Sequence, residues 1–217
     1  MISLRGVTKY YRVAGHRRVV LRDIYAHFET GSSYGVLGIN GAGKSTLMRI
    51  LAGTEKPNSG RVKRTRRVSW PLGFSGGFHS LMTGRENLKF VARAYGEDVR
   101  KVTSFVEDFA ELGDFLDAPV KTYSSGMQAR LAFGLSMAVH FDCYLIDEVT
   151  AVGDARFAAK CNEVFAQRRQ NCDIIMISHG METLKDYCSK GVVVADGNVL
   201  FFDDIDDAIE LYRRMNF

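Results

Sequence analysis

The chain has 217 residues and a net charge of +4, with 46% hydrophobic and 25% charged residues. This composition is ordinary for a globular protein, and the length suits one domain with at most a subdomain. The charge is compatible with a place near an anionic membrane surface, but it is too small to indicate nucleic acid binding. No apolar run approaches the roughly 20 residues that span a bilayer, and we expect no secretory signal. A role at a membrane would therefore need a partner.

Four cysteines are widely spaced, without a C-x-x-C pair: Cys143, Cys161, Cys172 and Cys188. This spacing predicts neither a metal site nor a disulfide framework, and it favours a reducing compartment.

The first third of the chain has the pattern of strands around one short helix. Residues 1–30 alternate as strands do, residues 33–37 form a short buried strand, and a helix from Lys44 should end at Gly53. The basic run 61–67 then predicts a solvated hairpin rather than a binding patch.

The middle of the chain, residues 84–140, is predicted to be mostly helical. Its clearest apolar stripe predicts a helix from Val99 to Leu112 that Gly113 ends. This stripe indicates a core face rather than a ligand surface.

Apolar runs with strand character return at 143–146, 173–177 and 192–195. Helical segments separate them, which predicts parallel strands with crossovers. A hairpin turn is expected at 196–198 and a closing helix at 205–215. The chain should therefore fold into a largely parallel α/β core with a β-rich start and a helical insertion.

Residues 38–45 read Gly-Ile-Asn-Gly-Ala-Gly-Lys-Ser, a full match to the phosphate-binding loop G-x-x-x-x-G-K-[ST]. Gly41 and Gly43 let the backbone take conformations that a side chain would block, so that a row of N–H groups can surround a phosphate. Lys44 would reach the β- and γ-phosphates, and Ser45 would offer its hydroxyl to Mg²⁺. The following helix points the positive end of its dipole at the same anion. A bound nucleoside triphosphate is therefore expected.

Tyr144-Leu145-Ile146-Asp147-Glu148 is an apolar strand that ends in two carboxylates. Asp147 is expected to hold Mg²⁺, mostly through water, because this ion keeps much of its hydration shell. Glu148 is expected to orient or deprotonate the water that attacks the γ-phosphate.

Two further places could face a phosphate. Ser124 and Ser125 precede a predicted helix that runs to about His140, where small residues could bind an anion or only cap the helix. His179 follows an apolar strand, and ligands of open parallel sheets bind at the carboxyl ends of strands.

Together these segments resemble the ATP-binding subunits of ABC transporters over essentially the whole chain. The matching motifs are Walker A at 38–45, the signature at 123–127, Walker B at 143–148, the loop after it at 151–154 and the switch histidine at His179. Tyr11 falls where that family stacks an aromatic ring on adenine, with Tyr10 as the alternative.

The resemblance implies a P-loop NTPase fold, an ABC-type nucleotide-binding domain over residues 1–217. This fold has a mostly parallel core sheet, an antiparallel β subdomain and a helical subdomain inserted at about 78–140. It implies an ATPase that binds ATP and Mg²⁺, with Glu148 and His179 as catalytic residues and Ser45 and Asp147 at the metal. The implied nucleotide contacts are Tyr11, Gly38, Asn40, Gly41, Ala42, Gly43, Lys44, Ser45, Thr46, Ser124, Gly126 and Asp154.

A narrower resemblance, to exporters of bacterial capsular polysaccharide, rests on residues 69–78, 83–87, 121–127 and 147–157. It implies a peripheral subunit on the cytoplasmic face of the inner membrane. Its implied partners are a second copy, head to tail, and an integral membrane permease through which the polysaccharide is reached. Direct nucleic acid contact is not expected. O-antigen or teichoic acid exporters remain the near alternative, and a non-transport ABC ATPase or a nucleotide-sensing regulator the distant ones.

The chain departs from that family in two places. The signature has Ser125 for Gly and Met127 for Gln, and no glutamine lies between residues 54 and 127. The glutamine loop that couples such subunits to the membrane partner therefore lacks its usual side chain. His79 or a backbone carbonyl within residues 72–80 could take its place.

Overall fold

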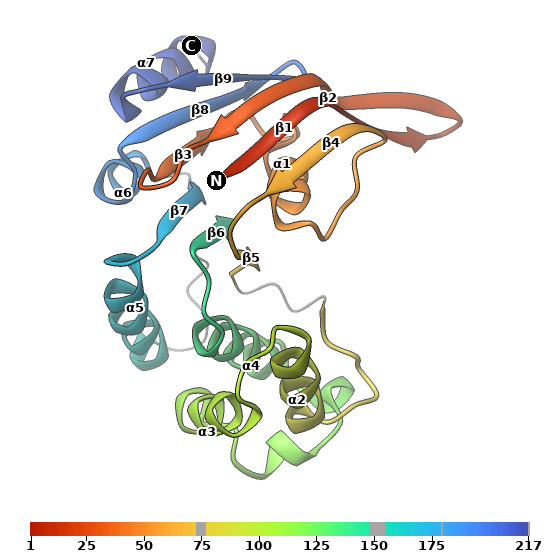
Figure 1. Cartoon of the computed structure of the whole chain (residues 1–217), viewed down its shortest axis with the longest axis vertical. Coiled ribbons are helices and arrows are strands. Elements are labelled where there is room, and N and C mark those ends of the chain that lie inside the picture. The colour runs from red at the N-terminus through yellow and green to blue at the C-terminus, as the bar shows by residue number, and fades with distance from the viewer. Residues whose placement is uncertain (73–76, 148–154, 179, 217) are drawn as a thin grey trace. The chain divides into compact units, whose positions relative to one another are not determined.

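The computed structural model describes residues 1–72, 77–147, 155–178 and 180–216, apart from the side chains of Ala155 and Asn216. The chain divides into two compact units. The first contains residues 1–71, 141–148 and 171–217, and the second contains residues 72–140 and 149–170. Figure 1 shows the elements of both units, and each unit contains buried apolar residues.

The first unit contains a three-stranded antiparallel sheet in the order β2-β1-β4. Its strands are β1 (Ile2–Val13), β2 (His16–Phe28) and β4 (Ser59–Arg64). The alternation of residues 1–30 is thus confirmed as a long hairpin, whose register shifts at bulges between Leu4 and Tyr10.

The first unit also contains a six-stranded sheet in the order β5-β6-β7-β3-β8-β9. Its strands are β3 (Tyr34–Leu37), β5 (Val68–Pro71), β6 (Cys143–Asp147), β7 (Asp173–Ile177), β8 (Lys190–Ala195) and β9 (Asn198–Phe202). All neighbours are parallel except β8 and β9, which are joined by a turn at residues 196–197, inside the expected range 196–198. The mostly parallel core is therefore confirmed.

Helix α1 (Lys44–Ala52) packs into the hydrophobic core that both sheets share. Leu47, Met48, Ile50 and Leu51 are fully buried, which makes a wide apolar side of the helix. A helix with such a wide buried side is anchored firmly by the core.

Helices α6 (Met181–Tyr187) and α7 (Ile205–Asn216) cover the other face of the six-stranded sheet, as Figure 1 shows beside β8 and β9. Gly35 of β3 marks this face, because a Cβ there would stand 2.7 Å from Ile205 and 3.3 Å from Leu184. Its neighbour Val36 points into the core that contains α1, since successive strand residues face opposite sides. The β3 strand is thus covered on both faces.

The expected hairpin at 61–67 is wrong. β4 ends at Arg64 and β5 begins at Val68, but the two strands belong to different sheets. Arg64 is half-buried, and its guanidinium donates hydrogen bonds to the carbonyls of Ile50 and Leu51 at the end of α1. This arginine therefore caps a helix, and burial lowers its pKa.

The second unit is helical in its described part. It contains α2 (Gly84–Ala94), α3 (Val99–Ala110), the short 3₁₀ helices η2 (Gly113–Asp117) and η3 (Val120–Thr122), α4 (Ser125–Ala138) and α5 (Ala155–Arg169). The ring of Phe109 stacks on Phe133 at 5.9 Å and meets the edge of Phe157 at 5.3 Å, which joins α3, α4 and α5.

Helix α3 ends earlier than predicted. Its C-cap is Glu111, which has a left-handed φ of 54°, so the helix does not reach Leu112. Lys160 donates a 2.8 Å hydrogen bond to Glu111 and two more to the carbonyls of Asp108 and Phe109. A lysine from α5 therefore satisfies the end of α3, and no local pattern could indicate this.

Candidate functional site

Three parallel strands bring the predicted motifs to one edge of the six-stranded sheet. β3 ends at Leu37 directly before the phosphate loop, and β6 ends at Asp147. β7 lies between them and ends at Ile177, two positions before His179. Parallel strands have their carboxyl ends at the same edge of a sheet. The phosphate loop, Asp147 and the segment after β7 therefore all begin at this edge.

The phosphate loop has the backbone that its glycines allow. Gly43 is the N-cap of α1 with φ 109°, and no side chain caps this end of the helix. A Cβ on Gly43 would stand 2.6 Å from Cγ1 of Val20 in β2, so no other residue fits. The first N–H groups of α1 are therefore left for an anion, as the predicted role requires.

Lys44 is folded back over the loop. Its Nζ donates hydrogen bonds to the carbonyl oxygens of Gly38 at 2.6 Å and Ile39 at 3.1 Å. Ser45 is exposed, while the side chain of Thr46 is buried. The loop thus combines a cation, uncapped helix N–H groups and a backbone conformation that needs glycine. These features together suit the binding of a polyphosphate chain.

Of the remaining predicted loop contacts, Gly38 is buried and the other three are more open to solvent. Asn40 and Gly41 are exposed and Ala42 is half-buried. The N–H of Ala42 donates to the carbonyl of Ile39 at 3.1 Å, which closes the turn. The tip of the loop at Asn40 and Gly41 is thus open to solvent.

Both residues that were predicted to hold Mg²⁺, Ser45 and Asp147, lie in the described part of the chain. Asp147 is half-buried at the end of β6, opposite Ile177 of β7. Among the described residues no group of three or more His, Cys, Asp or Glu side chains could hold a metal. A site of one hydroxyl and one carboxylate suits Mg²⁺, which keeps several waters and is completed by phosphate oxygens.

Tyr11 lies beside the start of α1. Its hydroxyl donates to Oε1 of Glu55 at 2.7 Å, and the hydroxyl of Thr46 lies 3.2 Å away. Arg49 and Lys9 surround the same carboxylate, with nitrogen–oxygen distances of 2.9 Å and 2.7 Å. Burial raises the pKa of Glu55, but the hydrogen bonds from Lys9, Tyr11 and Arg49 outweigh it and lower this pKa to about 2. Glu55 is therefore ionised and fixes Tyr11.

Tyr10, the alternative to Tyr11, faces the other side of β1. The guanidinium of Arg17 lies over its ring, 4.8 Å from the centroid. The structure therefore brings Tyr11, not Tyr10, to the first turn of α1.

The signature segment lies in the second unit, and Ser124 is the N-cap of α4. Its hydroxyl oxygen accepts a 3.2 Å hydrogen bond from the N–H of Met127. Ser124 is exposed and Gly126 is half-buried. Because the cap bond uses an oxygen lone pair, the hydroxyl hydrogen can still be donated to a phosphate. Capping and anion binding are therefore compatible in Ser124.

Three predicted site residues, Glu148, Asp154 and His179, lie outside the described residues. Their expected roles stay predictions.

Asn87 is a residue that sequence reasoning missed. It is buried in the first turn of α2, and its Oδ1 accepts the N–H of His79 at 2.8 Å. Its Nδ2 donates to the carbonyls of His79 at 3.2 Å and Thr83 at 2.9 Å. The sequence signal that could have found Asn87 is a polar residue on the apolar face of a predicted helix. Asn87 therefore holds the backbone of the segment in which the glutamine is missing.

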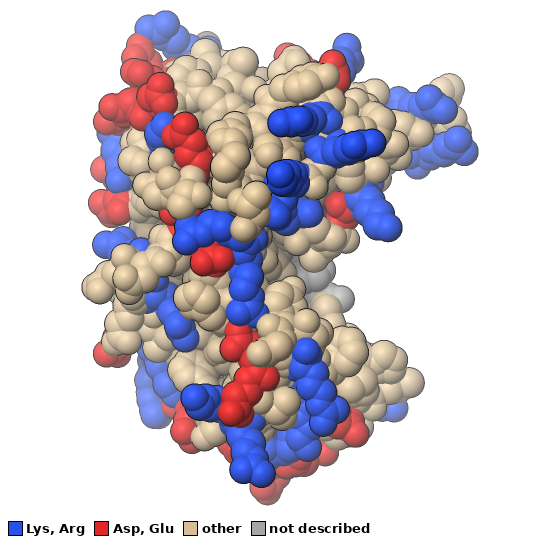
Figure 2. Space-filling model, in the orientation of Figure 1, with Lys and Arg blue, Asp and Glu red and all other residues tan. Residues whose placement is uncertain are grey.

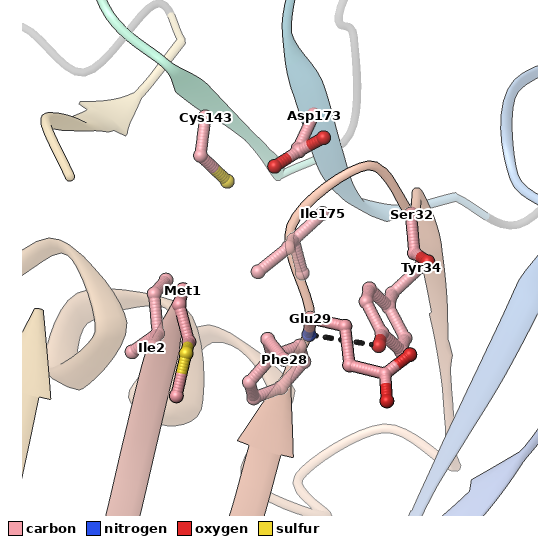
Figure 3. Close-up of a pocket in the computed structure, with 9 residues that line it drawn as sticks. All are labelled: Met1, Ile2, Phe28, Glu29, Ser32, Tyr34, Cys143, Asp173 and Ile175. Atoms are coloured by element: carbon pink, nitrogen blue, oxygen red, sulfur yellow. Dashed lines mark hydrogen bonds between the residues drawn. The ribbon is translucent and has the colours of Figure 1, made fainter. Parts of the chain in front are cut away.

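A small pocket of the first unit lies at the opposite edge of the six-stranded sheet (Figure 3). Cys143, Asp173 and Tyr34 line it, and they stand at the amino ends of β6, β7 and β3. Asp173 already accepts the N–H of Gly31 at 2.8 Å. The pocket is therefore a feature of the core and not part of the nucleotide site.

The four cysteines are free thiols, as expected. Burial raises the pKa of Cys143, Cys161 and Cys188 to about 12, so these three are inert core residues. In the described part of the chain, no helix has the length and hydropathy of a membrane span.

Comparison with known proteins agrees with this geometry. Residues 21–151 match the family model described as ABC transporter. The chain is 50% identical over 215 residues to the capsule polysaccharide export ATP-binding protein CtrD of Neisseria meningitidis serogroup B, covering 99% of this chain and 100% of the relative. It is 46% identical over 217 residues to the polysialic acid transport ATP-binding protein KpsT of Escherichia coli, covering 99% of each.

The fold is also similar to a solved structure. The ATP-binding cassette MJ0796, in a dimeric post-hydrolysis state bound to ADP and phosphate, superposes with a TM-score of 0.74 at 20% identity, covering 94% of this chain and 99% of that one. These matches confirm the expected ABC-type α/β fold, the kinship with capsular polysaccharide exporters and the ATP-hydrolysing class of enzyme. The chain belongs to the ABC transporter family.

Proposed function

We propose that this chain is the ATP-hydrolysing subunit that powers export of a bacterial cell-surface polysaccharide, of the capsular kind, across the inner membrane. The observation that carries ATP hydrolysis is the carboxyl edge of the six-stranded sheet, where the phosphate loop follows β3 and Asp147 ends β6. The identity of 50% with a capsule export protein over 99% of this chain supports the polysaccharide as cargo.

ATP would bind along residues 38–45. Lys44 would exchange its two loop carbonyls for phosphate oxygens, and the ring of Tyr11 would stack on adenine. Ser45 and Asp147 would hold Mg²⁺, which supplies positive charge beside the phosphates.

Hydrolysis would use residues at the ends of β6 and β7. Glu148 would orient a water and accept its proton as the water oxygen attacks the γ-phosphorus. The bond from the γ-phosphorus to its bridging oxygen breaks, which leaves ADP and phosphate. His179 would contact the γ-phosphate. Both roles rest on sequence position, since Glu148 comes one residue after β6 and His179 two residues after β7.

A second copy of the chain would complete the site. Ser124, Gly126 and Asp154 of that copy would cover the γ-phosphate in a head-to-tail dimer. The free hydroxyl hydrogen of Ser124 supports this role, and the solved cassette is described as dimeric. Closing the interface on ATP and opening it after hydrolysis would move the membrane subunits.

The expected membrane partner is an integral permease, with this chain at the cytoplasmic face of the membrane. The segment 72–80 would contact the permease, and His79 would stand in for the missing glutamine. Asn87 supports this by fixing the backbone of His79.

The enzymatic part is tested by two substitutions in the purified chain. Glu148→Gln should bind MgATP, form a dimer on size exclusion with ATP and lose nearly all turnover. Lys44→Ala should instead lose nucleotide binding by more than about tenfold, since it removes a charge-assisted contact. Substantial ATP turnover by Glu148→Gln would contradict the proposed role of this glutamate in activating the attacking water.

The cargo is tested in cells. A strain that lacks the chain should retain its surface polymer inside, and the wild-type chain should restore export, whereas Glu148→Gln should not. Normal surface polymer in the deletion strain would reject polysaccharide export.

A further inference from the structure

Arg18 stands opposite Tyr11 in the antiparallel pair of β1 and β2. Directly opposed residues in such a pair point to the same face of the sheet. Tyr11 faces the start of α1, where its hydroxyl lies 3.2 Å from that of Thr46. The side chain of Arg18 therefore leaves β2 toward the same end of α1.

The guanidinium of Arg18 reaches the phosphate loop. Its Nη2 is 3.6 Å from the position that a Cβ on Gly41 would take. Val20, two residues along β2, also approaches the loop, with its Cγ1 2.6 Å from the position that a Cβ on Gly43 would take. The β2 strand thus runs along the phosphate loop, and Arg18 lies beside the exposed Gly41 of that loop.

This arginine is available for a ligand. Arg18 is exposed, and no acidic side chain in the described part of the chain forms an ion pair with it. Figure 2 shows Lys and Arg side chains gathered over the projecting end of the β1–β2 hairpin. An arginine beside backbone N–H groups that bind phosphate suits bidentate contact with phosphate oxygens.

We propose that Arg18 is a nucleotide-binding residue whose guanidinium contacts the phosphate chain of ATP in the loop 38–45. This inference rests on the proposed ATP binding by that loop and adds a second cation to Lys44. The two cations come from different sides, because Lys44 lies in α1 and Arg18 in β2.

Arg17 provides the matched control. It precedes Arg18 in β2, carries the same charge and is also exposed. Its guanidinium lies 4.8 Å from the centroid of the Tyr10 ring, on the face turned away from the loop. Substitution of Arg17 therefore changes the net charge equally without touching the phosphate site.

The experiment measures the affinity of the purified chain for the non-hydrolysable analogue AMPPNP with Mg²⁺, by isothermal titration calorimetry. The affinity for inorganic tripolyphosphate follows from competition. Arg18→Gln should weaken both ligands by about tenfold, as for loss of one charge-assisted hydrogen bond. Arg18→Lys should lose less affinity than Arg18→Gln. The affinity of Arg17→Gln should stay within about twofold of the wild type. Unchanged melting temperatures would confirm that the variants are folded.

Three outcomes would overturn the proposal. Arg18→Gln could bind both ligands as the wild type does, or Arg17→Gln could lose as much as Arg18→Gln. Arg18→Gln could also bind AMPPNP more weakly but tripolyphosphate equally well, which would assign the arginine to the base or ribose. A wild-type chain that binds no nucleotide would reject the proposed function itself, so the two failures are distinguishable.

Discussion

The hydroxyl of Tyr11 donates a 2.7 Å hydrogen bond to the carboxylate of Glu55, 44 residues later in the chain. Glu55 follows α1, and Tyr11 lies in β1, so this bond joins the antiparallel sheet to the helix that begins in the phosphate loop. Arg49 strengthens the link, because its Nη2 donates to the hydroxyls of Tyr11 and Thr46, both at 3.3 Å. The proposed adenine-binding ring is thus positioned through its hydroxyl.

Because the hydroxyl of Tyr11 bonds to Glu55 while its ring is the proposed stacking surface, substitutions can measure the two contributions separately. Tyr11→Phe keeps the stacking surface and should retain ATP affinity within about threefold, while Tyr11→Ala should weaken it by about tenfold or more, since stacking on a base contributes about 1–3 kcal/mol. Tyr11→Phe should still lower the free energy of unfolding by about 1 kcal/mol, because Glu55 loses a donor. Fluorescence titration with a labelled ATP and urea unfolding measure the two effects. If Phe and Ala weakened ATP equally, the hydroxyl and not the ring would be the binding group.

Glu55 should make stability depend on pH in the acid range. Its pKa in the folded protein is about 2, below the ordinary 4.5, so the ionised carboxylate stabilises the folded state. That contribution is complete above pH about 4.5 and is lost as the pH falls toward about 2. Glu55→Gln should therefore cost about 1–2 kcal/mol at pH 7 once solvent screening is allowed for, and less at pH 3.

Urea unfolding at pH 7, 5 and 3 checks this dependence on Glu55. Glu97→Gln is the comparison variant: Glu97 lies in the helical unit, and its carboxylate accepts a 3.4 Å hydrogen bond from the backbone N–H of His140. An equal cost for Glu55→Gln at all three pH values would contradict the role of its charge.

Much of the fold follows from patterns that are local. The strands of the six-stranded sheet are short apolar runs, and the turn at Asp196 and Gly197 has the positive φ values that these residues tolerate. The order of the strands could not be predicted, because the position of β7 between β6 and β3 depends on crossovers. The end of α3 was missed for a similar reason, since Glu111 is held by a lysine 49 residues away.

The candidate site divides in the same way. The phosphate loop around Lys44 could be predicted from the sequence, because its expected ligand contacts come from consecutive residues. The pairing of Tyr11 with Glu55 and the approach of Arg18 to Gly41 depend on how β1 and β2 lie along α1. Contacts of this kind have no signature in a single sequence, since either partner alone is an ordinary strand or surface residue.

Gly43 and Gly41 should respond differently to alanine, although both have positive φ. Gly43→Ala combines a strained backbone with a Cβ 2.6 Å from Val20, and it should lower the free energy of unfolding by roughly 2–4 kcal/mol. Gly41→Ala meets no atom closer than 3.6 Å and should cost only about 1 kcal/mol. Thermal or urea unfolding measures the difference. Equal costs at both positions would mean that β2 moves away from the loop.

Asn87 should be more important for stability than its place on α2 suggests. Asn87→Ala leaves the N–H of His79 and the carbonyls of His79 and Thr83 without their side-chain partner, and it should lower the free energy of unfolding by about 2 kcal/mol. Lys89→Ala, on the exposed face of the same helix, should stay within about 0.5 kcal/mol. Hydrogen exchange should become faster at the amide of His79, because the bond that protects it is gone. Slow exchange at that amide in Asn87→Ala would show that the segment keeps its conformation without the asparagine.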